Sequence, residues 1–497
     1  MLTNRLDELR SSVETPPEGL DWDESTWHKA GARLVDLAAS ISTDWDGRRP
    51  SPSSPDDALS YFSEALPEDP APINDLIDRI EREVLPTSGY NGHPRWLAYI
   101  MGAPVPVSVL GNFAATALNQ NSGLWRVTPA STAVEVQTLS WLAEMLGLPP
   151  TAEGIFVSGG QMANIVAHAV IRDVKAPWDV RAHGMRGPDG NAPRLRIYAS
   201  SELHYCHDQA ADLLGFGTEA VRHVPVDENY RIRLDALGKM IAEDRARGDL
   251  PIAIVGTAGT VATGAIDPIP ALLEAARAED LWLHIDGAYG AFAALAESCP
   301  PELKALAESD SIACDPHKWL FQPIDTGVAF IREPGLLERS FASHASYLHT
   351  EDRTPHVDFL ERGPENSRPQ RALKLWLAIQ AFGRRGYAAM IDYNIRLAAY
   401  MEELVRTTET LALAAPRELS IVCWRVEPEG VAKSNLDDLH TAVIEEIERR
   451  GIAMVSNAQL LDGRTAIRAC IVNFRTRAED VEMIVKASAE IGAELAR

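Results

Sequence analysis

The sequence predicts an α/β protein whose mostly parallel, buried sheet is flanked by helices. Between about residues 100 and 335, short apolar runs alternate with amphipathic stretches of helical length, a pattern typical of β-α units. Glycine, aspartate and lysine residues follow several of these runs. Ligands of such sheets bind at the ends of the strands, where these residues are expected to lie. The 497 residues suffice for about three structural units, so a large core and a deep cleft are expected.

The first part of the chain is expected to form a helical arm over residues 1–95. Polar helical segments are interrupted there by a Pro- and Ser-rich stretch at 48–57 and by a second breaker at 66–72. Proline and serine clusters end helices, and the segment has modest apolar content. We therefore expect an arm that does not fold independently.

The large domain is expected over residues 96–380 and the small α+β domain over residues 381–497. A long helical pattern begins after Ala372 and leads into the small domain, where helices are predicted at 436–450 and at the C-terminus. Strands are predicted at the apolar runs 154–157, 196–199, 252–256, 281–285 and 311–314 in the large domain, and at 420–426 and 466–472 in the small one.

Charge and cysteine usage exclude several classes of protein. The chain has 71 acidic and 47 basic residues, a net charge of −24, which disfavours nucleic-acid and membrane-surface binding. The N-terminus carries charges from the start and lacks the apolar core of a secretion signal, so a cytoplasmic protein is expected. The five cysteines are scattered without C-x-x-C spacing, so neither a disulfide framework nor a bound metal is predicted.

Three strand ends carry residues with chemical potential. After the run at 154–157, Ser158-Gly159-Gly160-Gln161 opens a helix, which suits either an anion cradle or a simple tight turn. After 281–285, Asp286 is either a functional carboxylate or a helix cap. After 311–314 comes Lys318, which taken alone is typical of a surface charge.

Together these three features match the contacts that pyridoxal phosphate requires. A lysine amine forms a Schiff base with the cofactor, and a carboxylate keeps the pyridine nitrogen protonated so that the ring accepts electrons. Lys318 and Asp286 would supply these groups, and the Gly-rich turn would receive the phosphate. His204, after the run at 196–199, could stack on the ring.

From about His93 to the C-terminus, the sequence resembles the group II pyridoxal-phosphate amino acid decarboxylases. This family includes aromatic L-amino acid, tyrosine and glutamate decarboxylases. The resemblance rests on the motifs at 125–131, 158–160, His204, 257–260, 264–267, 284–290, 315–319, 371–376 and 467–473.

This resemblance implies fold type I of the pyridoxal-phosphate enzymes and assigns roles to individual residues. Lys318 would be the Schiff-base lysine, Asp286 the partner of the pyridine nitrogen and His204 the stacking residue. It also implies a homodimer whose N-terminal arm wraps the partner. The expected cofactor-binding set comprises Gly159, Gly160, Gln161, His204, Thr260, Asp286, Ala288, Asp315, His317 and Lys318, with His317 also counted among the catalytic candidates.

The chain departs from the family pattern around the substrate site. Gln161 stands where the aromatic enzymes carry a hydroxyl residue, and Val261 where they carry a threonine that contacts the cofactor. Gly102 replaces a threonine of the substrate site, while Trp96 and Tyr99 are expected to keep the pocket wall aromatic.

The largest departure concerns the tyrosine that, in the family, protonates the substrate carbon after carbon dioxide leaves. An alignment anchored at Arg371 places Phe359 at that position, and a phenyl ring cannot donate a proton. Family members with this replacement release aldehyde, ammonia and peroxide. If the loop alignment slips, Tyr347, His349 or His356 could supply the proton instead.

The expected activity is decarboxylation of an L-amino acid with an aromatic or bulky apolar side chain to the amine. An oxidative aldehyde synthase is the first alternative, since it shares every site residue except the proton donor. A non-catalytic dimeric scaffold is a second alternative, which joint retention of Lys318, Asp286 and His204 disfavours. A lyase acting on phosphorylated amino alcohols is a third, and such relatives usually carry a membrane anchor.

Overall fold

The computed structural model describes residues 2–13, 21–45, 47–52, 55–343, 357–432 and 435–497. The chain forms two compact units, Met1–Tyr90 and Asn91–Arg497. Within the described residues, no helix combines the length and the apolar character needed to cross a membrane.

The first unit is helical. Its longest helix begins where the Asp23 carboxylate accepts a hydrogen bond from the Thr26 amide, and Arg33 on that helix forms an ion pair with Asp78. The elements are α1 (Leu2–Ser12), α2 (Glu24–Thr43), α3 (Pro55–Tyr61), α4 (Ile73–Arg79) and a π-helical turn (Ile80–Val84).

The second unit is built around a seven-stranded sheet with the order β1-β7-β6-β5-β4-β2-β3. Neighbouring strands are parallel except for β7, which is antiparallel to both β1 and β6. The sheet confirms the predicted fold class, and all five predicted strands are present. The strands are β1 (Glu153–Val157), β2 (Leu195–Ser200), β3 (Val221–Val224), β4 (Leu250–Thr257), β5 (Trp282–Asp286), β6 (Ser311–Cys314) and β7 (Gly327–Ile331).

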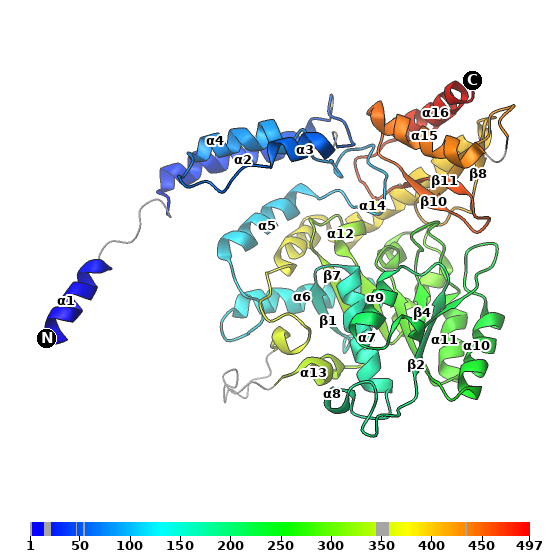
Figure 1. Cartoon of the computed structure of the whole chain (residues 1–497), viewed down its shortest axis with the longest axis horizontal. Helices are drawn as coiled ribbons and strands as arrows, with labels where there is room; N and C mark the ends of the chain where they lie inside the picture. The colour runs from blue at the N-terminus through cyan, green and yellow to red at the C-terminus, as the bar shows by residue number, and fades with distance from the viewer. Residues whose placement is uncertain (1, 14–20, 46, 53–54, 344–356, 433–434) are drawn as a thin grey trace. The chain divides into compact units, whose positions relative to one another are not determined.

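Helices flank this sheet (Figure 1). The central strands are buried along their whole length, which is why their sequences are continuous apolar runs instead of alternating ones. Helix α7 packs against β4 to β7. The helices are α5 (Pro106–Leu118), α6 (Pro129–Met145), α7 (Gly160–Lys175), α8 (Val180–His183), α9 (Cys206–Leu213), α10 (Leu234–Ala246), α11 (Ile269–Ala278), α12 (Pro316–Trp319) and α13 (Leu336–Phe341), with 3-10 turns at Thr218–Ala220, Ala291–Leu295, Pro301–Glu308 and Phe359–Glu361.

A second, antiparallel sheet follows, with the order β10-β11-β9-β8. Helix α14 (Ala372–Thr407) leads to it and is interrupted at Gly383, whose φ of 64° lies in the left-handed region. The sheet and its helices enclose a core of their own around Trp424 and Ile447. The elements are β8 (Leu411–Leu413), β9 (Ile421–Val426), α15 (Leu436–Arg449), β10 (Ser456–Gln459), β11 (Thr465–Cys470) and α16 (Ala478–Leu495).

The segment before α5 connects the two sheets of this unit. Trp96 forms a β-bridge with Met454, and the Ala103 amide donates to the Val472 carbonyl. The Val105 amide donates to the carbonyl of Phe321, beside the predicted Schiff-base lysine. This segment therefore packs against the part of the large sheet where the predicted site residues lie.

Candidate active site

A cavity of about 70 Å³ lies at the carboxyl edge of the large sheet. Because β1, β2, β4, β5 and β6 run in the same direction, the residues that follow them meet at this edge. The cavity is lined by Ile100, Gly160, Gln161, Asn164, His204, Cys206, Thr257, Gly259, Val261, Asp286, Ala288, Tyr289, Asp315 and Lys318.

Lys318 lies in α12, directly after β6, and points at a carboxylate. Its Nζ is 3.1 Å from Asp315 Oδ2, and the His317 ring is 3.6 Å from the same oxygen. His317 donates its Nδ1–H to the Thr326 carbonyl at 2.7 Å, and burial lowers the pKa of this imidazole. The amine is therefore held at the cavity by a short chain of buried groups.

Asp286 ends β5, with 6% of its surface exposed. Its Oδ2 accepts hydrogen bonds from His207 Nε2 at 2.9 Å and from Asn164 Nδ2 at 3.3 Å, and its Oδ1 accepts the Ala288 amide at 3.1 Å. Burial raises the pKa of Asp286, but the His207 hydrogen bond and the charges of His207 and Lys318 bring it below its usual value. The carboxylate is therefore ionised inside the cavity wall, as a partner for a cationic ring nitrogen must be.

His204 lies between β2 and α9 and lines the cavity half-buried. Its Nδ1 accepts the Cys206 amide at 3.2 Å, which fixes the orientation of the ring. Burial lowers the pKa of His204, so the imidazole is neutral. A neutral, flat ring at the cavity wall is suited to stacking on an aromatic cofactor.

The start of α7 offers an anion site. Its N-cap, Gly159, has no side chain that could cap the helix, so the first amides remain available as donors. A β-carbon on Gly160 would lie 2.8 Å from both Ala288 Cβ and Asp315 Oδ2, so only glycine permits this close packing. Gln161 reaches sideways and donates to Gln209 at 2.9 Å.

Thr260, Trp96 and Tyr99 are not among the residues that line the cavity. Thr260 is buried in a turn, where its hydroxyl is 3.1 Å from that of Thr263 and accepts the Ala265 amide, and Thr257 lines the cavity instead. Trp96 and Tyr99 are absent from the described cavity wall, where Ile100 takes their place. The backbone of Trp96 is instead bridged to Met454, and the aromatic side chain of the described wall is that of Tyr289.

Gly102 has a different role from the one its alignment suggests. A β-carbon there would overlap the carbonyl oxygens of His317 and Lys318. The absence of a side chain therefore allows the chain to pass directly beneath the backbone of Lys318, and it does not widen the substrate pocket.

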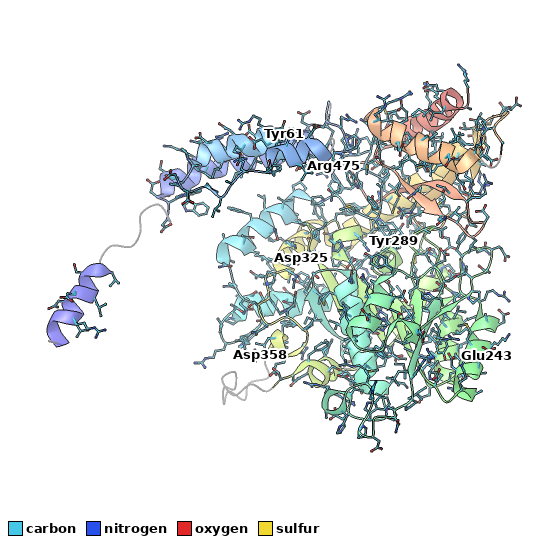
Figure 2. The ribbon with its side chains drawn as sticks, in the orientation of Figure 1. Tyr61, Glu243, Tyr289, Asp325, Asp358 and Arg475 are labelled. Atoms are coloured by element: carbon cyan, nitrogen blue, oxygen red, sulfur yellow. The ribbon has the colours of Figure 1, made fainter. Side chains whose placement is uncertain are left out.

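Two predicted catalytic residues are not among the residues that line the cavity: His317, whose ring lies beside Asp315, and Phe359. The Phe359 ring is 1% exposed and packs in the core, with the Arg368 guanidinium 4.9 Å from the ring centre. Figure 2 shows its neighbour Asp358 beside α13, well apart from Tyr289 of the cavity. Core packing therefore holds the ring away from the cavity in this chain, and the assignment of Phe359 to the proton donor's position stays a prediction. Tyr347, His349 and His356 lie outside the described residues.

Sequence reasoning missed two residues in contact with Asp286. Asn164 and His207 both donate to its carboxylate. Asn164 follows Gly160 by four residues on α7, so it lies on the same helix face, and this spacing was a usable signal. No spacing rule connects His207 to Asp286, because their contact joins elements 79 residues apart.

The groups that line the cavity suit pyridoxal phosphate chemically. Two buried oxygens in its wall, Asp315 Oδ1 and Thr257 Oγ1, have no hydrogen-bond partner, and buried polar atoms normally have one. An amine, an ionised carboxylate, a flat neutral imidazole and a helix N-terminus are the groups that this cofactor's aldehyde, ring nitrogen, ring face and phosphate require.

Relatives of known activity agree with this chemistry. The chain is 33% identical to the aromatic-L-amino-acid decarboxylase of Bacillus atrophaeus over 95% of this chain and 97% of the relative. It is 32% identical to an L-2,4-diaminobutyrate decarboxylase of Rhizobium meliloti (strain 1021), covering 86% and 84%. It is 27% identical to a phenylacetaldehyde synthase of a Rosa hybrid cultivar, covering 82% of each.

Solved structures share the fold. That of Oryza sativa TDC with PLP and tryptamine superposes with a TM-score of 0.87 at 24% identity, covering 97% of this chain and all of the other. The sequence profile described as the pyridoxal-dependent decarboxylase conserved domain matches residues 55–427. Since this match spans most of the chain, the protein belongs to the pyridoxal-dependent decarboxylase family and is a carboxy-lyase that acts on an amino acid with pyridoxal phosphate as its cofactor.

Proposed function

We propose that the protein removes the α-carboxyl group of an L-amino acid with an aromatic or bulky apolar side chain and releases the amine. The observation that carries this proposal is the placement of Lys318 and the ionised Asp286 in one cavity. The family assignment disfavours the non-catalytic scaffold and the amino-alcohol lyase.

When bound, pyridoxal phosphate supplies an electron-accepting ring conjugated to the substrate's amino group. Lys318 Nζ would hold the cofactor's aldehyde carbon, and Asp286 would keep a proton on the pyridine nitrogen by its negative charge. His204 would stack on the ring, and the first amides of α7 would bind the phosphate. The positions of these groups in and beside the cavity support the roles.

The described cavity wall supports an apolar substrate side chain. Its charged residues are Lys318, Asp286 and Asp315, and each lies in the ion pairs and hydrogen bonds described above. Ile100 and Val261 supply apolar surface, and 43% of the Val261 surface is exposed. A diaminobutyrate side chain would bring an ammonium group to this wall, where no further carboxylate faces it among the described residues.

An oxidative aldehyde synthase is the second candidate. The similarity to a phenylacetaldehyde synthase supports it, whereas the burial of Phe359 away from the cavity of this chain gives it no support.

A homodimer is part of the proposal. Helix α5 exposes Leu110, Phe113 and Leu118, each with more than half of its surface accessible. Exposed apolar side chains gathered on one helix are typical of an interaction surface. Size-exclusion chromatography with light scattering measures the oligomeric state, and a monomer would contradict this part of the proposal.

The substrate is tested by a screen of the standard amino acids together with DOPA and 5-hydroxytryptophan. Carbon dioxide, amine, aldehyde and peroxide are measured for each under air. We expect carbon dioxide and amine in equal amounts from an aromatic substrate. Turnover confined to diaminobutyrate would contradict the proposed side-chain class, and peroxide matching carbon dioxide would show the oxidative reaction.

A further inference from the structure

Three fully buried histidines lie behind Asp286, and the proposed mechanism does not yet use them. His168 is on α7, His207 on α9 and His284 on β5. Their ring centres are 5.1 to 6.0 Å apart. A buried imidazole is stable only where its nitrogens find partners, so the partners of these rings show what the cluster does.

One hydrogen-bonded line reaches Asp286 through two of the rings. His207 Nε2 lies 2.9 Å from Asp286 Oδ2, and His207 Nδ1 lies 2.8 Å from His168 Nε2. Because the ionised carboxylate can only accept, His207 Nε2 must carry the proton of the first contact. The remaining nitrogen, His168 Nδ1, is buried without a partner, and burial lowers the pKa of His168 well below its usual value. His168 is therefore neutral.

A second line reaches the same oxygen from the other side. Trp282 Nε1 donates to Ser311 Oγ at 2.8 Å, and Ser311 Oγ lies 2.8 Å from His284 Nδ1. Asn164 Oδ1 only accepts, so His284 Nε2 donates to it at 2.8 Å, and the unprotonated Nδ1 of this neutral ring accepts from the Ser311 hydroxyl. Burial lowers the pKa of His284 to about 3, which keeps this ring neutral as well. Asn164 Nδ2 then donates to Asp286.

The two oxygens of the Asp286 carboxylate accept different numbers of hydrogen bonds. Oδ2 accepts from both His207 and Asn164, whereas Oδ1 accepts only the Ala288 amide. A carboxylate oxygen has two acceptor positions. The free position is therefore on Oδ1, which the ring nitrogen of the cofactor can use.

We propose that His207 is a positioning residue of the active site, which holds Asp286 ionised and turned so that Oδ1 faces the pyridine nitrogen of pyridoxal phosphate. The proposal rests on the role assigned to Asp286 under the proposed function. His207 does not touch the cavity itself and acts through the carboxylate. The titratable groups that face this pair are His168, His284, Cys206, His204 and Lys318.

The test compares His207→Leu, which lacks the donor, with His207→Gln, whose amide nitrogen replaces Nε2–H. Two quantities are measured on the full chain: the dissociation constant for pyridoxal phosphate, and the ¹⁵N chemical shift of cofactor labelled at the ring nitrogen. A hydrogen bond to a charged group is worth about tenfold or more in an equilibrium. We expect His207→Leu to weaken binding by about that factor and to move the ¹⁵N signal toward the unprotonated ring, and His207→Gln to restore most of both.

The matched control is His223→Leu, which breaks another histidine–carboxylate pair, with Asp208 at 3.1 Å, and should leave both quantities unchanged. If His207→Leu does not fold, His207→Met replaces it, since methionine fills irregular gaps.

Wild-type values in the folded apolar variant, or equal losses in the apolar and Gln variants, would overturn the proposal. Asp286→Asn tests the role of Asp286 separately from that of His207. Wild-type values of both quantities in Asp286→Asn would refute the role of Asp286 itself.

Discussion

The position of Phe359 leads to a prediction that separates its two possible roles. If the ring stood in for a missing proton donor, Phe359→Tyr would add an acid and move product from aldehyde to amine. The structure instead buries the ring, with 1% of its surface exposed, against the Arg368 guanidinium at 4.9 Å. We therefore expect Phe359→Tyr to leave the ratio of amine to carbon dioxide unchanged and to lower stability.

The magnitude follows from the surroundings of the ring. A tyrosine keeps the aromatic face over Arg368, so its added cost is that of a buried hydroxyl, about 1–3 kcal/mol where no partner is found. Phe359→Leu removes that face as well. A desolvated cation–π contact contributes about 2 kcal/mol, so this variant should lose about 2–4 kcal/mol in all once the smaller side chain is included.

The assay measures amine, aldehyde, peroxide and carbon dioxide under air, together with thermal unfolding of each variant. Phe382→Tyr, at an exposed position of α14, is the control and should change neither quantity. A shift from aldehyde to amine in Phe359→Tyr alone would refute the reasoning, because it would place residue 359 at the reacting carbon. Unchanged stability in Phe359→Leu would show that the ring is not part of the core.

Four further predictions follow from the site and the core. Borohydride reduction of the holoenzyme should attach the cofactor to Lys318, as peptide mapping would show, and an adduct on Lys374, or full turnover in Lys318→Ala, would contradict this. Asp286→Asn should lower turnover about a thousandfold or more, since a charge that stabilises the transition state is lost; near-normal turnover would leave Asp286 only a structural role. Glu135→Gln should lower the free energy of unfolding by about 3–5 kcal/mol, measured by thermal or denaturant unfolding. Arg368 is buried against Glu135 at 2.6 Å and would lose its counter-charge. A loss below about 1 kcal/mol would be inconsistent with a buried ion pair. Burial lowers the pKa of Lys374 to about 8, so the unfolded chain binds this proton more tightly than the folded chain does. The free energy of unfolding, measured relative to Lys374→Met, should therefore rise between about pH 8 and 10.5 by on the order of 3 kcal/mol. A free-energy difference between the two proteins that does not change with pH would contradict the lowered pKa.

The sequence by itself determined the architecture and the cofactor chemistry. The predicted strands of the large sheet appear within a residue or two of their expected bounds, because strands buried on both faces read as continuous apolar runs. Lys318, Asp286, His204 and Gly160 meet at one edge, because residues that follow parallel strands must do so. The division at residues 95 and 380 stays a prediction, since the compact units divide after Tyr90.

The tertiary structure decided what depends on contacts between distant elements. Strand β7 runs antiparallel within the sheet, and its direction is set by its neighbours and not by its own residues. Phe359 lies in the core because Arg368, buried with Glu135, covers its ring, which a loop alignment cannot show. His207 reaches Asp286 across 79 residues of chain. The spacing of residues along the sequence cannot predict such a hydrogen bond. The bond forms only when separate strands and helices pack together and exclude water from both partners.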